Sequence, residues 1–342
     1  MRNEQSDHLR KLLKASHLYC KAKGEISYRK IAKAFDQNYA NYGKRLIEES
    51  KLQGIITFEY KYHPPRLAGL EYALVQTFSA LRDAIVTPST EDYEFQRRLW
   101  GEAAAEYFDK EIALPKTKVG LSGGNTLYEM IAALPEKDRD IILYPTAIIG
   151  RGPTVAHVDP IANVTLLWAK SGRKADRAHY VTVLPFEKGQ LVQDVRKEYK
   201  QFLKRAKVQA VLEEMKSLDA VVTSLGPANA SAEYMKYTHS TTLGLLKEMG
   251  ITKEKLLAMG AVGDICYCYL KEDGSTSPDL DFFLTLGRET LVEMASKYPH
   301  KKVVVIAGKH KMDPLRAVLK GRLCSVLITD ELTAEELVRN FK

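Results

Sequence analysis

The sequence predicts a two-part protein: an N-terminal winged helix-turn-helix domain, followed by a larger Rossmann-like α/β domain with a mainly parallel sheet. Three observations lead to this expectation. The 342 residues exceed what one ordinary hydrophobic core holds. Positive charge gathers in the first fifth of the chain. Beyond residue 84, short apolar strands alternate with helical stretches, which is the pattern of a parallel sheet covered on both faces.

The basic charge belongs almost entirely to the N-terminal segment. Residues 1–66 hold 14 Lys and Arg against 7 Asp and Glu, so they account for +7 of the formal net charge of +8. The rest of the chain holds 37 basic and 36 acidic side chains. A basic head on a near-neutral body favours a polyanionic partner, usually nucleic acid. A solvated basic surface is the alternative that charge alone leaves open.

Composition excludes several other classes of protein. With 45% hydrophobic and 27% charged residues, the chain has ordinary soluble composition, and no run approaches the roughly 18 apolar residues of a membrane helix. The first residues lack the apolar core of a signal peptide, so we expect a cytoplasmic protein. Of the four cysteines, Cys266 and Cys268 are separated by one residue rather than the two to four typical of zinc knuckles. We therefore expect reduced thiols and no metal.

The basic head predicts three helices and a strand over residues 1–62. Leucines recur at helical intervals over residues 12–18, and Ser27 stands where an N-cap would begin a short second helix. The turn-prone residues 36–38 lead to a third helix that Gly54 closes, and residues 55–62 alternate like a strand. This order is typical of a winged helix-turn-helix, although other small helical domains share it. The third helix would present side chains that reach phosphates and base edges: Asn38, Asn41, Lys44 and Arg45.

A stiff break at residues 63–65, which include two prolines, is followed by leucines at helical spacing, so residues 63–83 are predicted to form a linker helix. The body then spans residues 84–342. Its expected strands are the segments AIVTP, KVGLS, IILYPTA, HYVTVLPF, DAVVTSLG, DFFLTLG, KKVVVIAG and CSVLITD.

Open α/β sheets bind ligands at the carboxyl ends of their strands, and four predicted turns there are candidates. The first follows Val119, covers residues 120–126 and leads into a helix over residues 127–133. Its two glycines would let backbone N–H groups face a phosphate at the helix N-terminus, with short polar side chains as further donors. An ordinary Gly-containing strand-to-helix turn is the alternative. The candidate ligands are Ser122, Gly123, Gly124, Asn125 and Thr126.

The other three turns add a glycine, a carboxylate and a lysine. The second covers residues 223–226 and ends at Gly226. In the third, residues 260–265, the carboxylate of Asp264 could accept hydrogen bonds from sugar hydroxyls. The fourth, residues 307–311, holds two lysines, either of which could neutralise a phosphate or simply face solvent.

The order of these motifs resembles the SorC family of sugar-binding transcriptional regulators. The segment GLSGGNT matches the family pattern G-x-S-(W/G)-G-x-T, residues 260–265 match G-A-V-G-D-I in full, and VVVIAGKHK and residues 325–330 match its closing segments. The head departs from the usual pattern: IAKAFDQNYANYGKRLI is one residue longer, with Gly43 near the usual valine. The lysine loop is one residue shorter.

The resemblance implies a C-terminal sugar-phosphate-isomerase-like (NagB/RpiA-like) domain that binds a phosphorylated sugar effector. It implies that the first turn and a lysine hold the phosphate, with Lys311 favoured over Lys309, and that Asp264 takes sugar hydroxyls. Arg151 lies in a stretch similar to the family's G-R-S-P turn and would face the effector. Family practice also implies operator DNA as a partner and assembly as a homodimer or homotetramer.

We therefore expect a ligand-responsive DNA-binding regulator without cofactor or catalytic residues. The alternative is a sugar-phosphate isomerase or transferase on the same sheet. An isomerase needs a base within reach of a carbon-bound proton. Asp264 or His310 could serve as this base, but we identify no second acid or base at a matching strand end. The basic head would also have no purpose in an isomerase.

Overall fold

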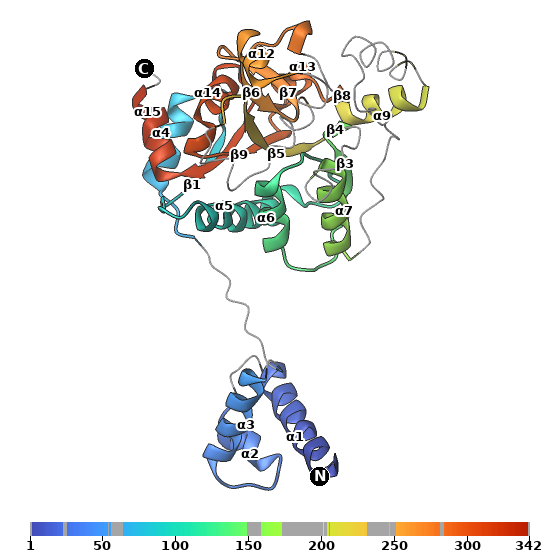
Figure 1. Ribbon diagram of the computed structural model, residues 1–342, viewed down its shortest axis with the longest axis vertical. Helices are drawn as coiled ribbons and strands as arrows, with labels where there is room; N and C mark the ends of the chain where they lie inside the picture. Colours follow the sequence, from blue (N-terminus) through green and yellow to red (C-terminus); the bar gives the residue numbers. More distant parts are fainter. Residues whose placement is uncertain are drawn as a thin grey trace. The chain divides into compact units, whose positions relative to one another are not determined.

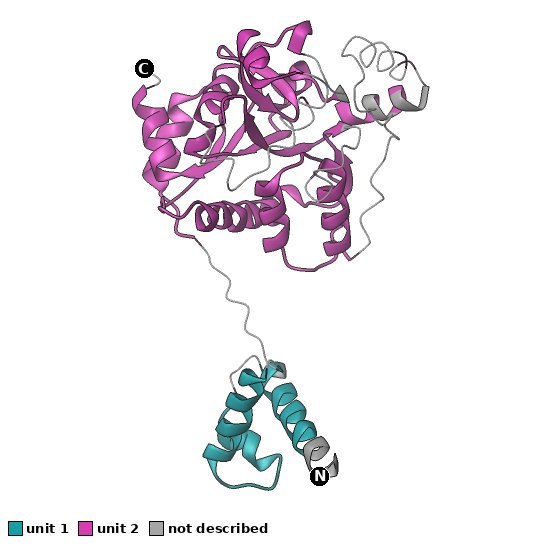
Figure 2. Cartoon of the chain, in the orientation of Figure 1, with its two compact units in different colours: residues 1–61 teal, residues 62–342 magenta. Residues whose placement is uncertain are grey.

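The computed structural model describes residues 2–22, 26–53, 55, 64–148, 159–172, 201, 204, 206–230, 246, 251–280 and 284–340. The chain forms two compact units, residues 1–61 and residues 62–342 (Figures 1 and 2). Among the described residues, no helix has both the length and the apolar character needed to cross a bilayer.

The first unit is a bundle of three helices: α1 (Arg2–Lys21), α2 (Tyr28–Lys33) and α3 (Ala40–Leu52). Ser27 caps α2 as predicted, because its side chain accepts a hydrogen bond from the amide of Lys30. A small apolar core holds the helices together: Leu12, Ala15, Ile31, Leu46 and Ile47. The helix order agrees with a helix-turn-helix, while the expected wing strand, apart from its first residue, lies outside the described residues.

Gly43 permits the close packing of α2 against α3. A Cβ added at this position would lie 2.1 Å from the carbonyl oxygen of Tyr28 and 3.1 Å from the amide nitrogen of Ala32. Both neighbours are backbone atoms, which cannot rotate away as a side-chain end can. The glycine that distinguishes this head from the usual family pattern therefore sets the distance between its second and third helices.

The second unit is built on a central sheet of six parallel strands in the order β1-β10-β9-β5-β2-β3. Their bounds are β1 (Asp83–Thr87), β2 (Lys118–Leu121), β3 (Ile142–Pro145), β5 (Ala220–Pro227), β9 (Lys302–Ile306) and β10 (Val326–Asp330). Two further strands, β6 (Ala261–Ile265) and β7 (Cys268–Lys271), extend it from β5 as an antiparallel hairpin.

Helices cover both faces of this sheet (Figure 1). One face packs against α5 (Tyr93–Tyr107) with its π-helical continuation (Phe108–Ile112), α6 (Asn125–Ala133) and α7 (Pro160–Lys170). The other packs against α4 (Ala68–Thr77), α9 (Ala206–Lys216), α13 (Arg288–Val292), α14 (Met312–Lys320) and α15 (Glu331–Asn340). The short helix α12 (Lys253–Ala258) precedes β6 and lies in a smaller core near the hairpin. The predicted mainly parallel α/β sheet is confirmed.

The segment assigned to a linker helix contains α4, which packs within the second unit. Leu74 is fully buried in the core beneath the sheet. The amide of Leu67 donates to the carbonyl of Val86, and the Glu71 carboxylate accepts from the Val86 amide at 3.0 Å. These bonds satisfy backbone groups along β1, the edge strand of the sheet.

Three expectations for the body are wrong. Residues 223–226 are not a turn, because β5 continues to Pro227 and its last residues find an antiparallel partner in β6. Residues 260–265 are likewise not a turn but largely that partner strand. The strand expected in residues 281–287 does not join the main sheet: β8 (Leu284–Thr285) pairs only with β4 (Ala147–Ile148) in a separate two-stranded sheet. The expected strand HYVTVLPF lies outside the described residues.

We expect Gly43→Ala to destabilise the first unit by about 1 to 3 kcal/mol, because the added methyl group overpacks a backbone contact. Hydrogen exchange of full-length protein would show faster exchange in peptides from residues 26–53. Gly69→Ala in α4 is the matched control, since no atom lies within 4 Å of its added Cβ. Equal protection of the two variants would contradict the close-contact role of Gly43.

Candidate functional site

The turn between β2 and α6 presents backbone N–H groups that find no acceptor in the described part of the protein. These are the amides of Gly123, Gly124, Asn125 and Thr126. Gly124 has φ +108°, a conformation that glycine adopts easily, and no atom lies within 4 Å of a Cβ built there. Because the same residues begin α6, the positive end of the helix dipole adds to these donors. The turn can therefore bind an anion. The helix begins at Asn125, two residues earlier than the sequence predicts.

Lys311 reaches this turn from the other side of β5. It ends the single helical turn that follows β9, and only 5% of its surface is exposed. Its Nζ donates to the hydroxyl of Thr126 at 3.3 Å and to the hydroxyl of Ser224, which in turn donates to the carbonyl of Ile306 at 2.7 Å. Three strands thus bring one ammonium group and two hydroxyl groups together at the carboxyl edge of the sheet. Lys309, two residues earlier, is exposed.

Burial changes the acidity of the Lys311 ammonium group. The loss of solvation lowers its pKa to about 7. The negative charge of Asp264 opposes this shift by favouring the charged form. The positive charge of Arg97 lowers the pKa further. Near neutral pH the amino group therefore lies close to its titration midpoint, and an arriving anion would favour the protonated form.

Asp264 lies beside this cluster on β6 and is 5% exposed. It stands opposite Gly226 of β5 in the antiparallel ladder, and its Oδ2 accepts a hydrogen bond from the amide of Tyr267 at 3.0 Å. A Cβ on Gly263 would lie 2.4 Å from the Gly226 carbonyl oxygen and 2.6 Å from Cβ of Pro314. Gly263 therefore allows β6 to lie close to β5 and α14, and the carbonyl of Gly226 is one of the backbone groups that it meets.

The structure brings together most of the effector residues expected from the sequence. The five turn residues, Gly226, Asp264 and Lys311 all lie at or next to the carboxyl edge of the sheet. Arg151 lies outside the described residues. No group of three or more His, Cys, Asp or Glu side chains suited to a metal ion occurs within the described ranges.

The expected DNA-binding residues lie in the first unit and are all exposed. Asn38 precedes α3, whereas Asn41, Lys44 and Arg45 lie on it. Lys44 pairs with Glu48 at 3.6 Å, and Arg45 lies over the ring of Tyr42 at 5.6 Å. Both contacts are at the surface, so the two cationic groups can exchange them for phosphates.

Sequence reasoning missed two residues near residues 122–126, which we call the anion-binding turn. Arg97 of α5 is 12% exposed at its side chain, pairs with Glu129 of α6 at 3.2 Å, and is close enough to Lys311 to lower its pKa. A signal was present, because position 97 adjoins the buried Gln96 and Trp100 on α5. Asn163 of α7 is fully buried and hydrogen-bonds to the turn. No local pattern marks it, since its contact is 41 residues distant.

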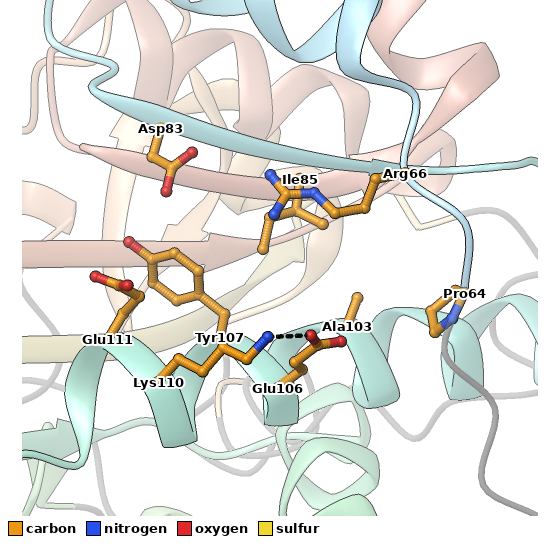
Figure 3. Close-up of a pocket in the computed structure, with 9 residues that line it drawn as sticks. All are labelled: Pro64, Arg66, Asp83, Ile85, Ala103, Glu106, Tyr107, Lys110 and Glu111. Atoms are coloured by element: carbon orange, nitrogen blue, oxygen red, sulfur yellow. Dashed lines mark hydrogen bonds and ion pairs between the residues drawn. The ribbon is translucent and has the colours of Figure 1, made fainter.

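A separate pocket opens near the amino end of β1 and is not part of this site (Figure 3). Its charged lining is mostly paired within the protein: Lys110 with Glu106 at 2.6 Å, Arg66 with Glu71 at 2.9 Å, and Glu111 with Lys302 at 2.9 Å. Tyr107 projects into it, and burial together with the nearby Asp83 raises the pKa of its hydroxyl. These compensated charges do not select a ligand of one sign.

Comparisons with known proteins agree on one family. The family model Sugar-bind, a sugar-binding domain, matches residues 62–339. The sorbitol operon regulator of Klebsiella pneumoniae is 24% identical over 343 residues, covering 98% of this chain and 100% of that protein. The crystal structure of the full-length regulator superimposes with a TM-score of 0.63 at 21% identity, covering 97% of this chain and 99% of that one. The central glycolytic genes regulator of Priestia megaterium is 24% identical over 275 residues, covering 80% of this chain and 72% of that protein.

We expect the stability of the effector-free protein to rise with pH above about 7 through Lys311. Its folded-state pKa of about 7 lies below the unfolded value near 10.5, so the unfolded state binds more protons between these values. Relative to Lys311→Met, the wild type should gain about 1 kcal/mol of unfolding free energy per pH unit across this range. Denaturant unfolding of both proteins from pH 6.5 to 9 measures the difference. A constant difference would show that Lys311 does not titrate near pH 7.

Proposed function

The chain belongs to the SorC type of sugar-binding transcriptional regulators, and from this we propose that its effector is a phosphorylated sugar held between residues 122–126 and Lys311. The carrying observation is that a buried amino group meets a turn whose four amides have no acceptor among the described residues. A phosphate dianion would accept hydrogen bonds from these amides and would form an ion pair with Lys311. It would also offset the cost of burying the ammonium group.

The sugar itself would extend towards Asp264. An ionised carboxylate accepts hydrogen bonds only, which suits the hydroxyl groups of a carbohydrate. The attraction between Asp264 and Lys311 already links the two ends of this site, so a ligand with an anionic and a hydroxyl-bearing end complements both. Arg151 is proposed to face the same effector.

The first unit is proposed to bind operator DNA through α3 and its N-terminal turn. The relatives named as operon regulators support this role, as do the exposed amide and cationic groups at residues 38–45. The effector would control DNA binding by favouring one arrangement of the subunits of a cytoplasmic homodimer or homotetramer. A coupling free energy of about 1 to 3 kcal/mol changes operator affinity roughly 5- to 150-fold.

The isomerase alternative loses its support. The relatives described above are named as regulators, and this chain is a regulator rather than an enzyme. The hydrogen bonds of Lys311 to Thr126 and Ser224 support a role in binding the effector, and we propose that this role requires no cofactor.

Lys311→Met should weaken binding of the effector about 10- to 150-fold, because a lost charged hydrogen bond costs roughly 1.5 to 3 kcal/mol. A panel of sugar phosphates, screened by thermal stabilisation and followed by calorimetry, supplies the ligand and its affinity. Lys309→Met is the matched control, since this neighbouring lysine is exposed and should have little effect. If the unphosphorylated sugar bound as tightly as its phosphate, the proposed phosphate site would be wrong.

Replacing Lys44 and Arg45 together by Ala should abolish retardation of a DNA fragment selected for binding to the wild type. Two fewer phosphate contacts should also reduce the slope of log affinity against log salt by about 2. The matched control replaces Lys216 and Lys297, two exposed lysines of the second unit, by Ala. This variant should retard the DNA fragment as the wild type does. Retained DNA binding by the Lys44 and Arg45 variant would place the DNA-contacting surface elsewhere on the protein.

A further inference from the structure

The anion-binding turn can point its N–H groups at a ligand only if its carbonyl groups point elsewhere and accept hydrogen bonds from other partners. The side chain of Asn163 provides such a partner from α7, which packs beside α6 and β3 (Figure 1). Its Nδ2 donates to the carbonyl of Ser122 at 3.1 Å and to the carbonyl of Gly124 at 3.5 Å. One bond therefore reaches the first residue of the turn and the other reaches the third. The side chain of Asn163 is fully buried.

Peptide geometry converts this contact into an orientation of donors. In a planar trans peptide, the C=O of one residue and the N–H of the next point in opposite directions. Drawing the Ser122 carbonyl towards Asn163 therefore turns the amide of Gly123 away from Asn163. The Gly124 carbonyl also accepts from the amide of Tyr128 at 3.1 Å, so Asn163 and the first turn of α6 together turn the amide of Asn125 in the same way. These two amides belong to the set without an acceptor among the described residues.

We propose that Asn163 is a positioning residue of the anion-binding turn: it aims the amide of Gly123 at the bound phosphate and, together with the first turn of α6, the amide of Asn125. This inference rests on the proposed phosphate site. Asn163 itself need not touch the ligand. Its contribution is to fix two peptide planes before the phosphate arrives, so that binding does not have to order them.

Stability alone gives a poor account of this side chain. The helix already has a cap, because Asp159 accepts from the amide of Ala162 at 2.6 Å, and Val164 and Leu167 supply its apolar contacts. Within the described part of the chain, the Oδ1 atom of Asn163 is buried and has no hydrogen-bond partner. A buried acceptor left unsatisfied is costly, so an apolar side chain would suit a purely structural position better.

The experiment follows inorganic phosphate binding to the full-length protein labelled with ¹⁵N-glycine. In the wild type, the amide signals of Gly123 and Gly124 should shift with phosphate and saturate. In Asn163→Leu, which removes both N–H donors while keeping the branching at Cγ, phosphate affinity should fall about tenfold or more. The shift of the Gly123 proton should also be largely lost. Leu167→Ala, on the same helix, should lower the melting temperature but leave phosphate affinity within about twofold of the wild type.

A second variant tests the direction of the hydrogen bonds and decides the matter if Asn163→Leu does not fold. Asn163→Asp keeps the shape but places carboxylate oxygens against two carbonyl oxygens. Burial raises the pKa of such a carboxyl, and its protonated form can donate one hydrogen bond. Phosphate affinity relative to the wild type at the same pH should therefore recover as pH falls from 8 to 5.5. No recovery would overturn the proposal.

The outcomes separate this inference from the function on which it rests. If the Gly123 signal of the wild type does not move with phosphate, the phosphate site fails and the role of Asn163 fails with it. If the wild-type signal moves, Lys311→Met weakens binding, and Asn163→Leu retains both the affinity and the shift, only the positioning role is wrong. Loss of affinity in Asn163→Leu with an unchanged melting temperature supports it.

Discussion

The burial of the Lys311 amino group is the constraint on which the rest of the site depends. An ammonium group removed from water is unstable unless it loses its proton or gains an anion and hydrogen-bond acceptors. Among the described residues, Lys311 donates hydrogen bonds to the hydroxyl groups of Thr126 and Ser224, and the negative charge of Asp264 favours its protonated form. Burial accordingly lowers the pKa of this amino group to about 7, and the phosphate of the proposed effector would compensate its charge.

Close backbone approaches make this burial possible. A Cβ on Gly308 would lie 2.3 Å from the Trp100 ring and 2.6 Å from Oδ2 of Asp330, so the loop that carries Lys311 can run here only with glycine. Asp330 itself accepts from Ser89 at 3.0 Å and from the amide of Thr333 at 3.0 Å. The aspartate of the segment VLITD therefore stabilises the start of α15 and the loop after β1. Its role is structural, although it lies at the same edge of the sheet as the effector residues.

The two sides of the turn are held in different ways. Lys311 donates to the hydroxyl groups of Thr126 and Ser224, whereas Asn163 donates to the carbonyls of the turn from α7. Arg97 links α5 to α6 through its ion pair with Glu129. Its positive charge lowers the pKa of Lys311. Separate residues therefore set the charge at this edge of the sheet, the direction of the turn's donors and the packing of α5 on α6.

The sequence by itself determined the local elements: the helix order of the basic head, the Ser27 cap, the alternation of strands and helices, and the glycine-rich turn. Each depends on periodicity or on residues a few positions apart. Only the tertiary structure decided that residues 260–265 pair as a strand, that Lys311 rather than Lys309 is buried, and that Asn163 meets the turn. Lys311 and Thr126 are 185 residues apart and meet because β5 lies between β9 and β2. Strand order follows from the packing of the whole sheet, which no local pattern contains.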